Sequence, residues 1–374
     1  MDDDQAALAR CVGDVERFAS DDWGRRPRRF TDRGSFVDLL STDDVEQLLA
    51  AGARRPSFRL VLDGATLPPA GWTRSVRLGG SVVDDAADLA GIVAAAASGA
   101  TVVLQGLHHL WPPLQRFCAQ LERATSHRVQ ANAYLSPAGA AGLAHHADTH
   151  EVLVLQVEGM KAWDVDGLGP LTLAAGDVLY LPAGTGHAAR AQQQHSLHVT
   201  IGVLATTFRH VLRRVLDGFE ELERPLPLGF ARPGQAHELA LEMACTLKTS
   251  VEQLIALDPD ALGAEEIART APPARPMAPG TLRAVLDPSA VGDHTRLQRD
   301  PRMSLRIEDD GDRAVLVGDG RRLLVPGAVR PALEVVVTRT ALTVGELAEL
   351  DATSRAVLAR RLLRDGFLEL ATSD

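Results

Sequence analysis

The middle of the chain, from about residue 129 to residue 203, consists of short apolar runs separated by turn residues. Gly, Pro and Asp lie between the runs, and these residues favour turns. The apolar runs are VQANAYL, VLVLQV, KAWDV, LTLAAGDVLYLPAG and SLHVTIGV. Many short strands at this spacing are typical of an antiparallel barrel or a double-sheet jelly roll. The pattern therefore predicts a β core in this segment.

The segment before this core mixes helix and strand patterns. Residues 41–53 begin with a capping serine and carry apolar residues at helical spacing, which predicts a helix. Residues 58–64 and 100–107 are short apolar runs and indicate strands. Residues 111–125 predict a helix with its prolines in the first turn, where proline is tolerated. We expect the apolar face of that helix to contain Leu114, Phe117, Cys118 and Leu121.

The chain after the core is predicted to be helical from residue 205 to about residue 269. Its first helix has an apolar stripe formed by Phe208, Val211, Leu212, Val215 and Leu216. The region carries more apolar surface than a short linker needs, so we predict that it joins two copies of the chain in a homodimer. Residues 271–280 are rich in Pro, Ala and Gly and predict a linker.

The last part of the chain predicts a separate small domain with a winged-helix pattern. Two strand-like segments, 314–318 and 321–327, precede two predicted helices and a closing strand. The signals for the helix ends are the capping-box pair Thr343 and Glu346, the N-cap Asp351 and the terminating Gly366. From residue 281 onward, 14 Lys and Arg residues balance 15 Asp and Glu residues. We therefore favour a packing or dimer-supporting module over a DNA-binding domain.

These patterns together predict an α+β protein with three parts. The first, at 1–204, contains the β core, an antiparallel barrel or jelly roll. The second is a helical dimerisation region at 205–270. The third is a C-terminal winged-helix domain at 281–374.

Charge and composition exclude several classes of partner. The 374-residue chain has a formal net charge of −10, which argues against binding to nucleic acid or to anionic membranes. No apolar run approaches the roughly 18 residues of a membrane-spanning helix, and the acidic start MDDDQAALAR is unlike a signal peptide. Three widely spaced cysteines suit a reducing compartment. We expect a cytoplasmic protein.

The sequence AHHADTHE, residues 144–151, places three of the 12 histidines of the chain around an aspartate. Such a cluster is costly to bury unless a cation holds it. Residues i and i+2 of a strand point to one face, so His146 and Asp148 can converge on one ion. His187, in the later sequence LPAGTGH, can complete two histidines and a carboxylate. This donor set is the facial triad of non-haem Fe(II) oxygenases, which leaves coordination positions open.

Two longer sequences around this cluster resemble the cupin-type JmjC oxygenases, especially their ribosomal-oxygenase branch. They are NAYLSPAGAAGLAHHADTHEVLVLQVEGMKAW and LAAGDVLYLPAGTGHAA with the later SLHVTIGV. The resemblance is strongest over about residues 130–203. It implies a double-stranded β-helix core of the jelly-roll or cupin type within a catalytic domain at 1–204, followed by a helical dimerisation region and a C-terminal winged helix. It implies Fe(II) ligands at His146, Asp148 and His187. It also implies that 2-oxoglutarate is the co-substrate and that Lys161 pairs with its C5-carboxylate. Further residues implied to line the co-substrate pocket are Asn132, Tyr134 and Thr200.

The residue pattern around Lys161 agrees with that role, because a lysine buried in a barrel strand needs an anion; a surface lysine is the alternative. We expect His150 at the substrate mouth, His145 pointing the other way and His198 in the barrel wall. His108 and His109 receive no role.

The resulting hypothesis is a 2-oxoglutarate-dependent dioxygenase that hydroxylates a side chain of a protein or peptide, possibly a ribosomal protein. A hydroxylase of a free amino acid or of a natural-product peptide is the close alternative. Two other classes stay open: a ligand-responsive regulator, and a redox-inert cupin that holds zinc or nickel.

Overall fold

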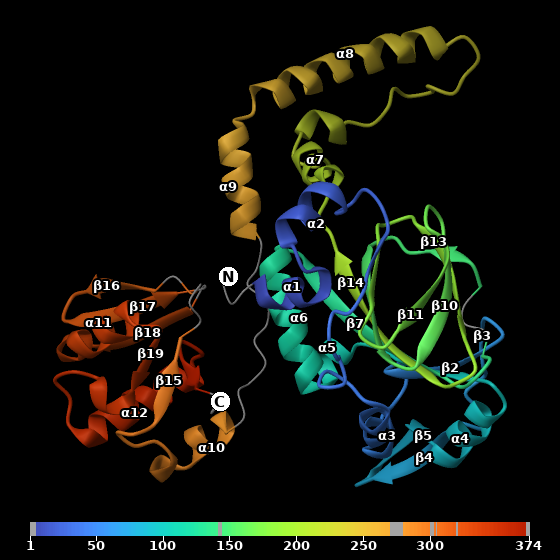
Figure 1. The fold of residues 1–374 in the computed structure, drawn as a ribbon. Coiled ribbons are helices and arrows are strands. Elements are labelled where there is room, and N and C mark those ends of the chain that lie inside the picture. Colours follow the sequence, from blue (N-terminus) through green and yellow to red (C-terminus); the bar gives the residue numbers. More distant parts are fainter. Residues whose placement is uncertain are drawn as a thin grey trace. The chain divides into compact units, whose positions relative to one another are not determined.

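The computed structural model of the chain describes residues 5–140, 144–269, 280–299, 303, 305–318 and 321–371. The chain divides into two compact units, Met1–Ala274 and Arg275–Asp374, each with its own apolar core (Figure 1). Of the predicted linker at 271–280, all but Gly280 lies outside the described residues.

The first unit is built on two facing antiparallel sheets (Figure 1). The larger sheet has, in spatial order, the eight strands β1 (Arg28–Phe30), β12 (Val178–Leu181), β9 (Glu151–Glu158), β14 (Ser196–Leu204), β7 (Arg128–Ser136), β6 (Thr101–Leu104), β2 (Phe58–Leu62) and β3 (Ala65–Thr66). The smaller sheet has the four strands β11 (Gly169–Ala174), β10 (Met160–Val165), β13 (Gly186–Ala191) and β8 (His146–Ala147). The predicted β core at 129–203 is confirmed, and the sheets form a double-stranded β-helix.

The strand β9 shows how the core is divided. Seven of its eight residues are buried, because each face of the strand packs against a different layer. Leu153, Leu155 and Val157 belong to the apolar cluster that includes the covering helices. Val152 and Val154 belong to the cluster inside the barrel, together with residues of the smaller sheet. A strand buried on both faces has a continuous apolar sequence, and VLVLQV is such a sequence.

The larger sheet is covered by helices on the side away from the barrel interior. The helices of this region are α1 (Ala6–Val12), α2 (Val15–Asp21), α3 (Thr42–Ala50), α5 (Leu107–Leu110) and α6 (Pro112–Thr125). α5 and α6 both contact β7, and α1 packs on α6. The predicted helices at 41–53 and 111–125 are therefore present, the first with a full capping box between Ser41 and Asp44. The four apolar residues predicted for the buried face of α6 are all buried.

A hairpin and a short helix extend this unit beside β2 and β6. They are β4 (Thr73–Leu78), β5 (Ser81–Ala87) and α4 (Leu89–Ala97).

The strand predicted to carry both His146 and Asp148 is shorter than expected. β8 contains only His146 and Ala147, and Asp148 lies just beyond its end. The backbone carbonyl of Asp148 accepts a hydrogen bond from the Gly184 amide, 2.8 Å away, which ties it to the turn before β13. Strand alternation alone therefore does not account for the convergence of these two side chains. The hydrogen bond from Gly184 holds the backbone of Asp148 beside the turn before β13.

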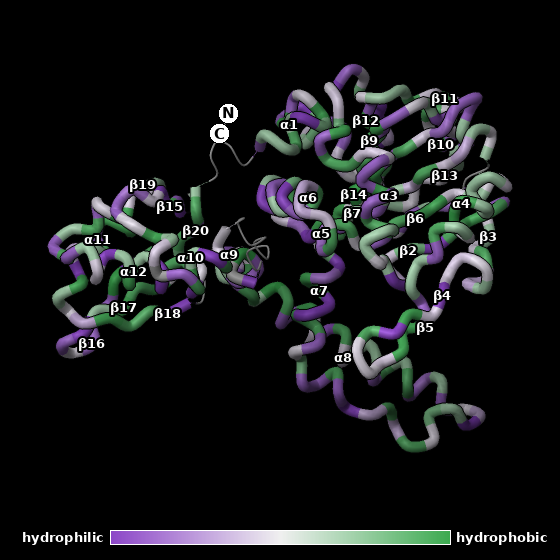
Figure 2. The backbone as a smooth tube through the Cα atoms, turned by 90° about the horizontal axis from the view of Figure 1, so that it is seen from below, coloured by the Kyte–Doolittle hydropathy of each residue, from purple (hydrophilic) through white to green (hydrophobic). Residues whose placement is uncertain are grey.

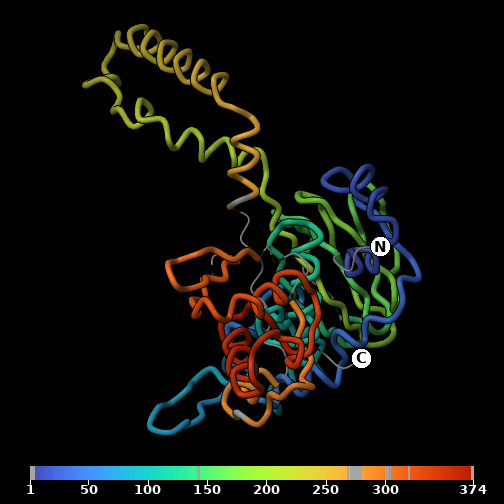
Figure 3. The backbone as a smooth tube through the Cα atoms, turned by 90° about the vertical axis from the view of Figure 1, so that its left-hand side faces the viewer, coloured from blue at the N-terminus to red at the C-terminus, as the bar shows by residue number. Residues whose placement is uncertain are grey.

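The helical region after the barrel contains α7 (Phe208–Leu216), the 3-10 turn η2 (Glu220–Glu223), α8 (Ala236–Ala256) and α9 (Pro259–Arg269). α8 is the long yellow-orange helix in Figure 3. Hydrophobic and hydrophilic residues alternate along α7 and α8 (Figure 2), yet no residue of α7 is buried. Large exposed apolar side chains in this region include those of Phe208, Leu212, Leu247, Ile255 and Ile267.

The second unit has two three-stranded sheets and several short helices around one core. One sheet contains β16 (Arg306–Asp310), β17 (Arg313–Gly318) and β18 (Arg321–Pro326). The other contains β19 (Ala341–Thr343), β15 (Arg296–Gln298) and β20 (Glu369–Leu370). The helical elements are α10 (Thr281–Leu286), η3 (Pro288–Ala290), η4 (Gly327–Val329), α11 (Arg330–Thr338), η5 (Val344–Glu346) and α12 (Ala352–Arg364).

One of the two helices predicted near the C-terminus is wrong. The capping box between Thr343 and Glu346 forms, but it caps only the single 3-10 turn η5. The chain then becomes extended at Leu347 and left-handed at Glu349, so the helical path ends before Asp351, which caps α12. The second predicted helix, α12, is present.

Candidate metal and co-substrate site

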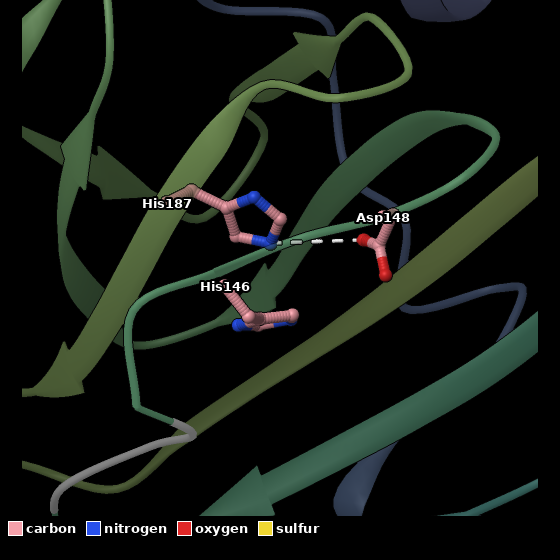
Figure 4. A group of neighbouring side chains, drawn as sticks. All are labelled: His146, Asp148 and His187. Atoms are coloured by element: carbon pink, nitrogen blue, oxygen red, sulfur yellow. Dashed lines mark ion pairs between the residues drawn. The ribbon is translucent and has the colours of Figure 1, made fainter.

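His146, Asp148 and His187 come together at one end of the barrel (Figure 4). His146 and His187 are direct cross-strand partners in β8 and β13, and their ring centroids lie 4.5 Å apart. His187 Nε2 lies 3.7 Å from Asp148 Oδ2. One ligand atom from each of the three residues lies within 4.8 Å of the others. Such convergence of two imidazoles and one carboxylate suits a divalent transition metal.

The hydrogen bonds of both histidines fix the tautomer that metal binding requires. His146 Nδ1 lies 2.8 Å from the carbonyl oxygen of Ala144, and His187 Nδ1 lies 3.0 Å from that of Thr185. A carbonyl oxygen can only accept, so each Nδ1 carries a hydrogen and each Nε2 keeps its lone pair for a metal. Burial also lowers the pKa of His187, which favours the neutral ring. These residues fit the metal that the sequence predicts.

The triad lies in the wall of a cavity of about 270 Å³ inside the barrel. All seven predicted site residues line this cavity. Its lining also contains Arg59, Val61, Thr101, Val103, Gln130, His150, Val152, Val154, Trp163, Ala189, His198 and Gly202. The structure therefore brings the predicted metal ligands and the predicted co-substrate residues to one site.

Lys161 is a buried cation in this cavity. Its side chain is 2% exposed, and its Nζ donates a hydrogen bond to Ser136 Oγ at 2.9 Å. Within the described residues, no carboxylate lies at ion-pair distance from Nζ, and burial lowers the pKa of Lys161 to about 7. The surface-lysine alternative is thus wrong. An anion in the cavity would supply the missing countercharge.

The three remaining predicted residues lie on neighbouring strands. Asn132 and Tyr134 lie two positions apart on the same face of β7. Thr200 on β14 is the cross-strand partner of Asn132. Asn132 Oδ1 accepts a hydrogen bond from the Gly106 amide at 3.0 Å, so its amide group is held in place. Burial raises the pKa of Tyr134, whose phenol therefore stays neutral and available to donate.

The neighbouring histidines differ in where they point. His145 lies 3.5 Å from Asp166, outside the cavity that holds the triad. His150 lines the cavity, and its Nε2 lies 3.4 Å from Gln130 Nε2. His198 is buried in the barrel wall. His108 accepts a hydrogen bond from the Ala131 amide at 3.1 Å, which is a structural contact.

Sequence reasoning missed Ser136, Arg59 and Gln130. Ser136 could have been found, because it follows Asn132 and Tyr134 at two-residue steps on the same face of β7. Gln130 could have been found in the same way, because it precedes Asn132 by two positions on β7. Arg59 carries no such signal, since it reaches the cavity only through the pairing of β2 with β6.

Comparison with known proteins shows which protein family this chain resembles. Residues 108–172 and 169–211 match the JmjC domain family, and this match includes every predicted site residue. The chain contains a JmjC domain. Over 149 residues it is 37% identical to the bifunctional lysine-specific demethylase and histidyl-hydroxylase NO66 of Drosophila simulans, across 31% of this chain and 18% of that protein. The NO66 protein of Branchiostoma floridae is 45% identical over 89 residues, 23% of this chain and 15% of that protein.

The match to the JmjC domain family confirms the predicted resemblance to JmjC oxygenases. The chain spans only about a fifth of the length of the fly protein, since the aligned part is 18% of it. A solved structure, that of E. coli ycfD, is similar over 96% of this chain and 98% of its own, with a TM-score of 0.50 and 18% identity. At this identity the likeness concerns the fold alone.

Proposed function

We propose that the protein is an Fe(II)- and 2-oxoglutarate-dependent oxygenase that hydroxylates a side chain of a protein or peptide. One observation carries the proposal: the cavity that holds the His146, Asp148 and His187 triad also holds the ammonium of Lys161, for which the described residues supply no carboxylate partner. A 2-oxo acid with a second carboxylate can occupy both ends of such a cavity. An inert metal-binding cupin has no need of the buried cation.

Each residue of the cavity has a task in this reaction. The triad would hold Fe(II) and leave positions open for the 2-oxo-acid group and for dioxygen. When bound, the iron supplies oxygen activation, with 2-oxoglutarate as the reductant that becomes succinate and CO₂. Lys161 holds the far carboxylate through a charge-assisted hydrogen bond and so fixes the direction of the co-substrate. Asn132, Tyr134 and Thr200 line the same cavity.

The lining of the cavity also bears on the substrate. Of the described residues that line it, Asp148 alone carries a carboxylate, and its charge is committed to the metal. Arg59 adds a positive charge to the wall. We infer that an uncharged substrate side chain is accepted in preference to a cationic one, because a cation would meet no counterion. The name histidyl-hydroxylase carried by the fly relative supports a neutral imidazole as a candidate.

The co-substrate assignment is tested by binding in the absence of turnover. We expect protein loaded with Mn(II) under argon to bind 2-oxoglutarate in calorimetry, and the Asp148→Ala variant to bind neither metal nor co-substrate. Equal binding of 2-oxoglutarate with and without metal would contradict the proposal. The substrate is then sought by mass spectrometry, as the peptide that gains one oxygen atom.

We further propose that the protein acts as a homodimer in the cytoplasm, joined through the region 205–270. The exposed apolar side chains of α7, α8 and α9 support this assembly. No described helix is long and apolar enough to cross a membrane. All three cysteines are free thiols, as suits a reducing compartment. The second unit is proposed to be a winged-helix-like packing module.

A further inference from the structure

The ammonium of Lys161 has a second neighbour besides Ser136, and this neighbour is a histidine. Lys161 Nζ lies 3.4 Å from His198 Nδ1. An ammonium can only donate hydrogen bonds, so this contact requires a lone pair on Nδ1 and therefore a neutral ring with its hydrogen on Nε2. Two of the three N–H groups of Lys161 are then directed at Ser136 and His198. The third is left for a ligand in the cavity.

Packing holds the His198 ring where it makes this contact. The ring is stacked on Tyr134, with centroids 4.8 Å apart and an interplanar angle of 4°. Trp163 packs against it in a T-shaped arrangement, at a centroid distance of 5.5 Å. His198 is 3% exposed, and it is the cross-strand partner of Tyr134. These two ring contacts and the burial of the side chain restrict rotation of the imidazole away from Lys161.

We propose that neutral His198 is a positioning residue that holds the Lys161 ammonium at the carboxylate-binding end of the cavity, and that Lys161 takes up a proton when a dicarboxylic 2-oxo acid binds there. This inference rests on the function proposed above. It concerns how the cavity binds its co-substrate, and it does not involve the metal ligands.

The charges around Lys161 explain the direction of the proton linkage. The other titratable and charged groups that line the cavity are Arg59 on β2, Tyr134 on β7, His198 on β14, His150 and the triad. Burial lowers the pKa of Lys161 to about 7, so near pH 7.5 part of the empty protein holds a neutral lysine. Burial, with the Lys161 charge as the lesser cause, lowers the pKa of His198 well below its usual range and keeps it neutral. A bound carboxylate favours the charged lysine, which takes up a proton.

The first test uses the unaltered protein. Mn(II)-loaded protein under argon is titrated with 2-oxoglutarate near pH 7.5 in two buffers that differ in ionisation enthalpy. We expect uptake of roughly half to one proton per ligand, as the lysine is partly neutral before binding. Pyruvate, which lacks the distal carboxylate, should bind with no such uptake. If 2-oxoglutarate and pyruvate give the same proton balance, the linkage is contradicted.

The second test asks whether residue 198 acts as a hydrogen-bond acceptor for Lys161 or only fills space. His198→Leu removes the acceptor, and we expect it to weaken 2-oxoglutarate binding about 10- to 100-fold, as for loss of a hydrogen bond to a charged group. His198→Asn restores an acceptor near the position of Nδ1 and should bind within about 3-fold of the parent. Affinities for Mn(II) and for pyruvate should stay unchanged in both. The matched control is His195→Leu. His195 is an exposed histidine that directly precedes β14, the strand that carries His198, and it lies 3.3 Å from Glu158.

Three outcomes would overturn the inference: parental affinity in His198→Leu, equal weakness in His198→Asn, or equal losses for pyruvate and 2-oxoglutarate. The last would show that the ring only supports the fold. If the parent protein itself binds no 2-oxoglutarate, the proposed function fails instead, and the two failures are therefore distinguishable.

Discussion

At the scale of single residues, Lys161 has the clearest functional consequence. If its ammonium pairs with the distal carboxylate, Lys161→Ala should raise the apparent KM for 2-oxoglutarate about 30- to 1000-fold, equivalent to about 2–4 kcal/mol. Lys161→Arg keeps the charge with a different reach, so partial activity is expected. Metal content, measured by plasma emission, should stay the same in both variants. If the Lys161→Ala protein kept the parental KM, Lys161 would not bind the distal carboxylate and would only line the cavity.

The same lysine should destabilise the fold. Its pKa is about 7 in the folded protein against 10.5 as a free side chain. Between these values the unfolded chain binds more protons, so stability should rise with pH from about 7 to about 10. Lys161→Met fills the space without the charge. We expect it to raise the free energy of unfolding by about 1–3 kcal/mol at pH 7, with the gain shrinking toward pH 10, in urea titrations. A loss of stability at pH 7 would contradict this reading.

The site was largely predictable from residues close together in the sequence. His146 and Asp148 lie two positions apart, and Lys161 follows in the next hairpin, so their chemistry and spacing were visible without a structure. The contacts of Lys161 were not. Ser136 lies on the same face of β7 as Asn132 and Tyr134, but Ser136 and His198 reach Lys161 only through strand pairing across the barrel.

At the scale of elements, the hairpin between β9 and β10 depends on one glycine. Gly159 has a φ of +66°, and a Cβ there would lie 2.1 Å from the His195 carbonyl oxygen. Gly159→Ala therefore meets both a left-handed backbone and a backbone clash. We expect it to lower the free energy of unfolding by more than about 2 kcal/mol and to disturb β10, which carries Lys161.

The matched control for this change is Gly169→Ala. Gly169 has a φ of +74°, but no atom lies within 4 Å of the position of its Cβ. Only the cost of a left-handed backbone applies, so we expect Gly169→Ala to lower the free energy of unfolding by about 1–2 kcal/mol. Equal losses in the two variants, measured by chemical denaturation, would show that the contact with His195 is unimportant.

Helices and strands were predicted correctly where the sequence carries a long apolar pattern. The α6 helix and the strands of the β core carry long apolar patterns, and they were predicted. β13 was missed as a strand, because its mixed polar sequence gives no period to detect, and β8 is shorter than the predicted strand. The helix predicted after Thr343 failed for another reason. Two capping signals only eight positions apart left room for a single turn before α12.

At the scale of the whole molecule, the exposed apolar surface of the helical region predicts self-association. Leu247 and Ile255 of α8 are 62% and 79% exposed. If α7–α9 form the interface, Leu247→Glu with Ile255→Glu should convert a dimer to a monomer in light scattering at micromolar concentration, because charges would be buried unpaired. The control is Leu78→Glu, a residue of β4 that is 61% exposed. A parent protein that is monomeric at this concentration would refute the dimer.

The most direct measurement of the central claim is succinate formation by the whole protein. The protein is loaded with Fe(II) and 2-oxoglutarate under argon and then exposed to air. Succinate is quantified by mass spectrometry, with Asp148→Ala and His187→Ala as ligand variants. His145→Ala serves as the matched control, since His145 lies outside the cavity, beside Asp166.

We predict succinate only when iron, 2-oxoglutarate and air are all present, its loss in both ligand variants with the fold intact, and its retention in the control. Succinate at the parental rate in either ligand variant, or none from the parent protein, would contradict the assignment of this cavity as an oxygenase site.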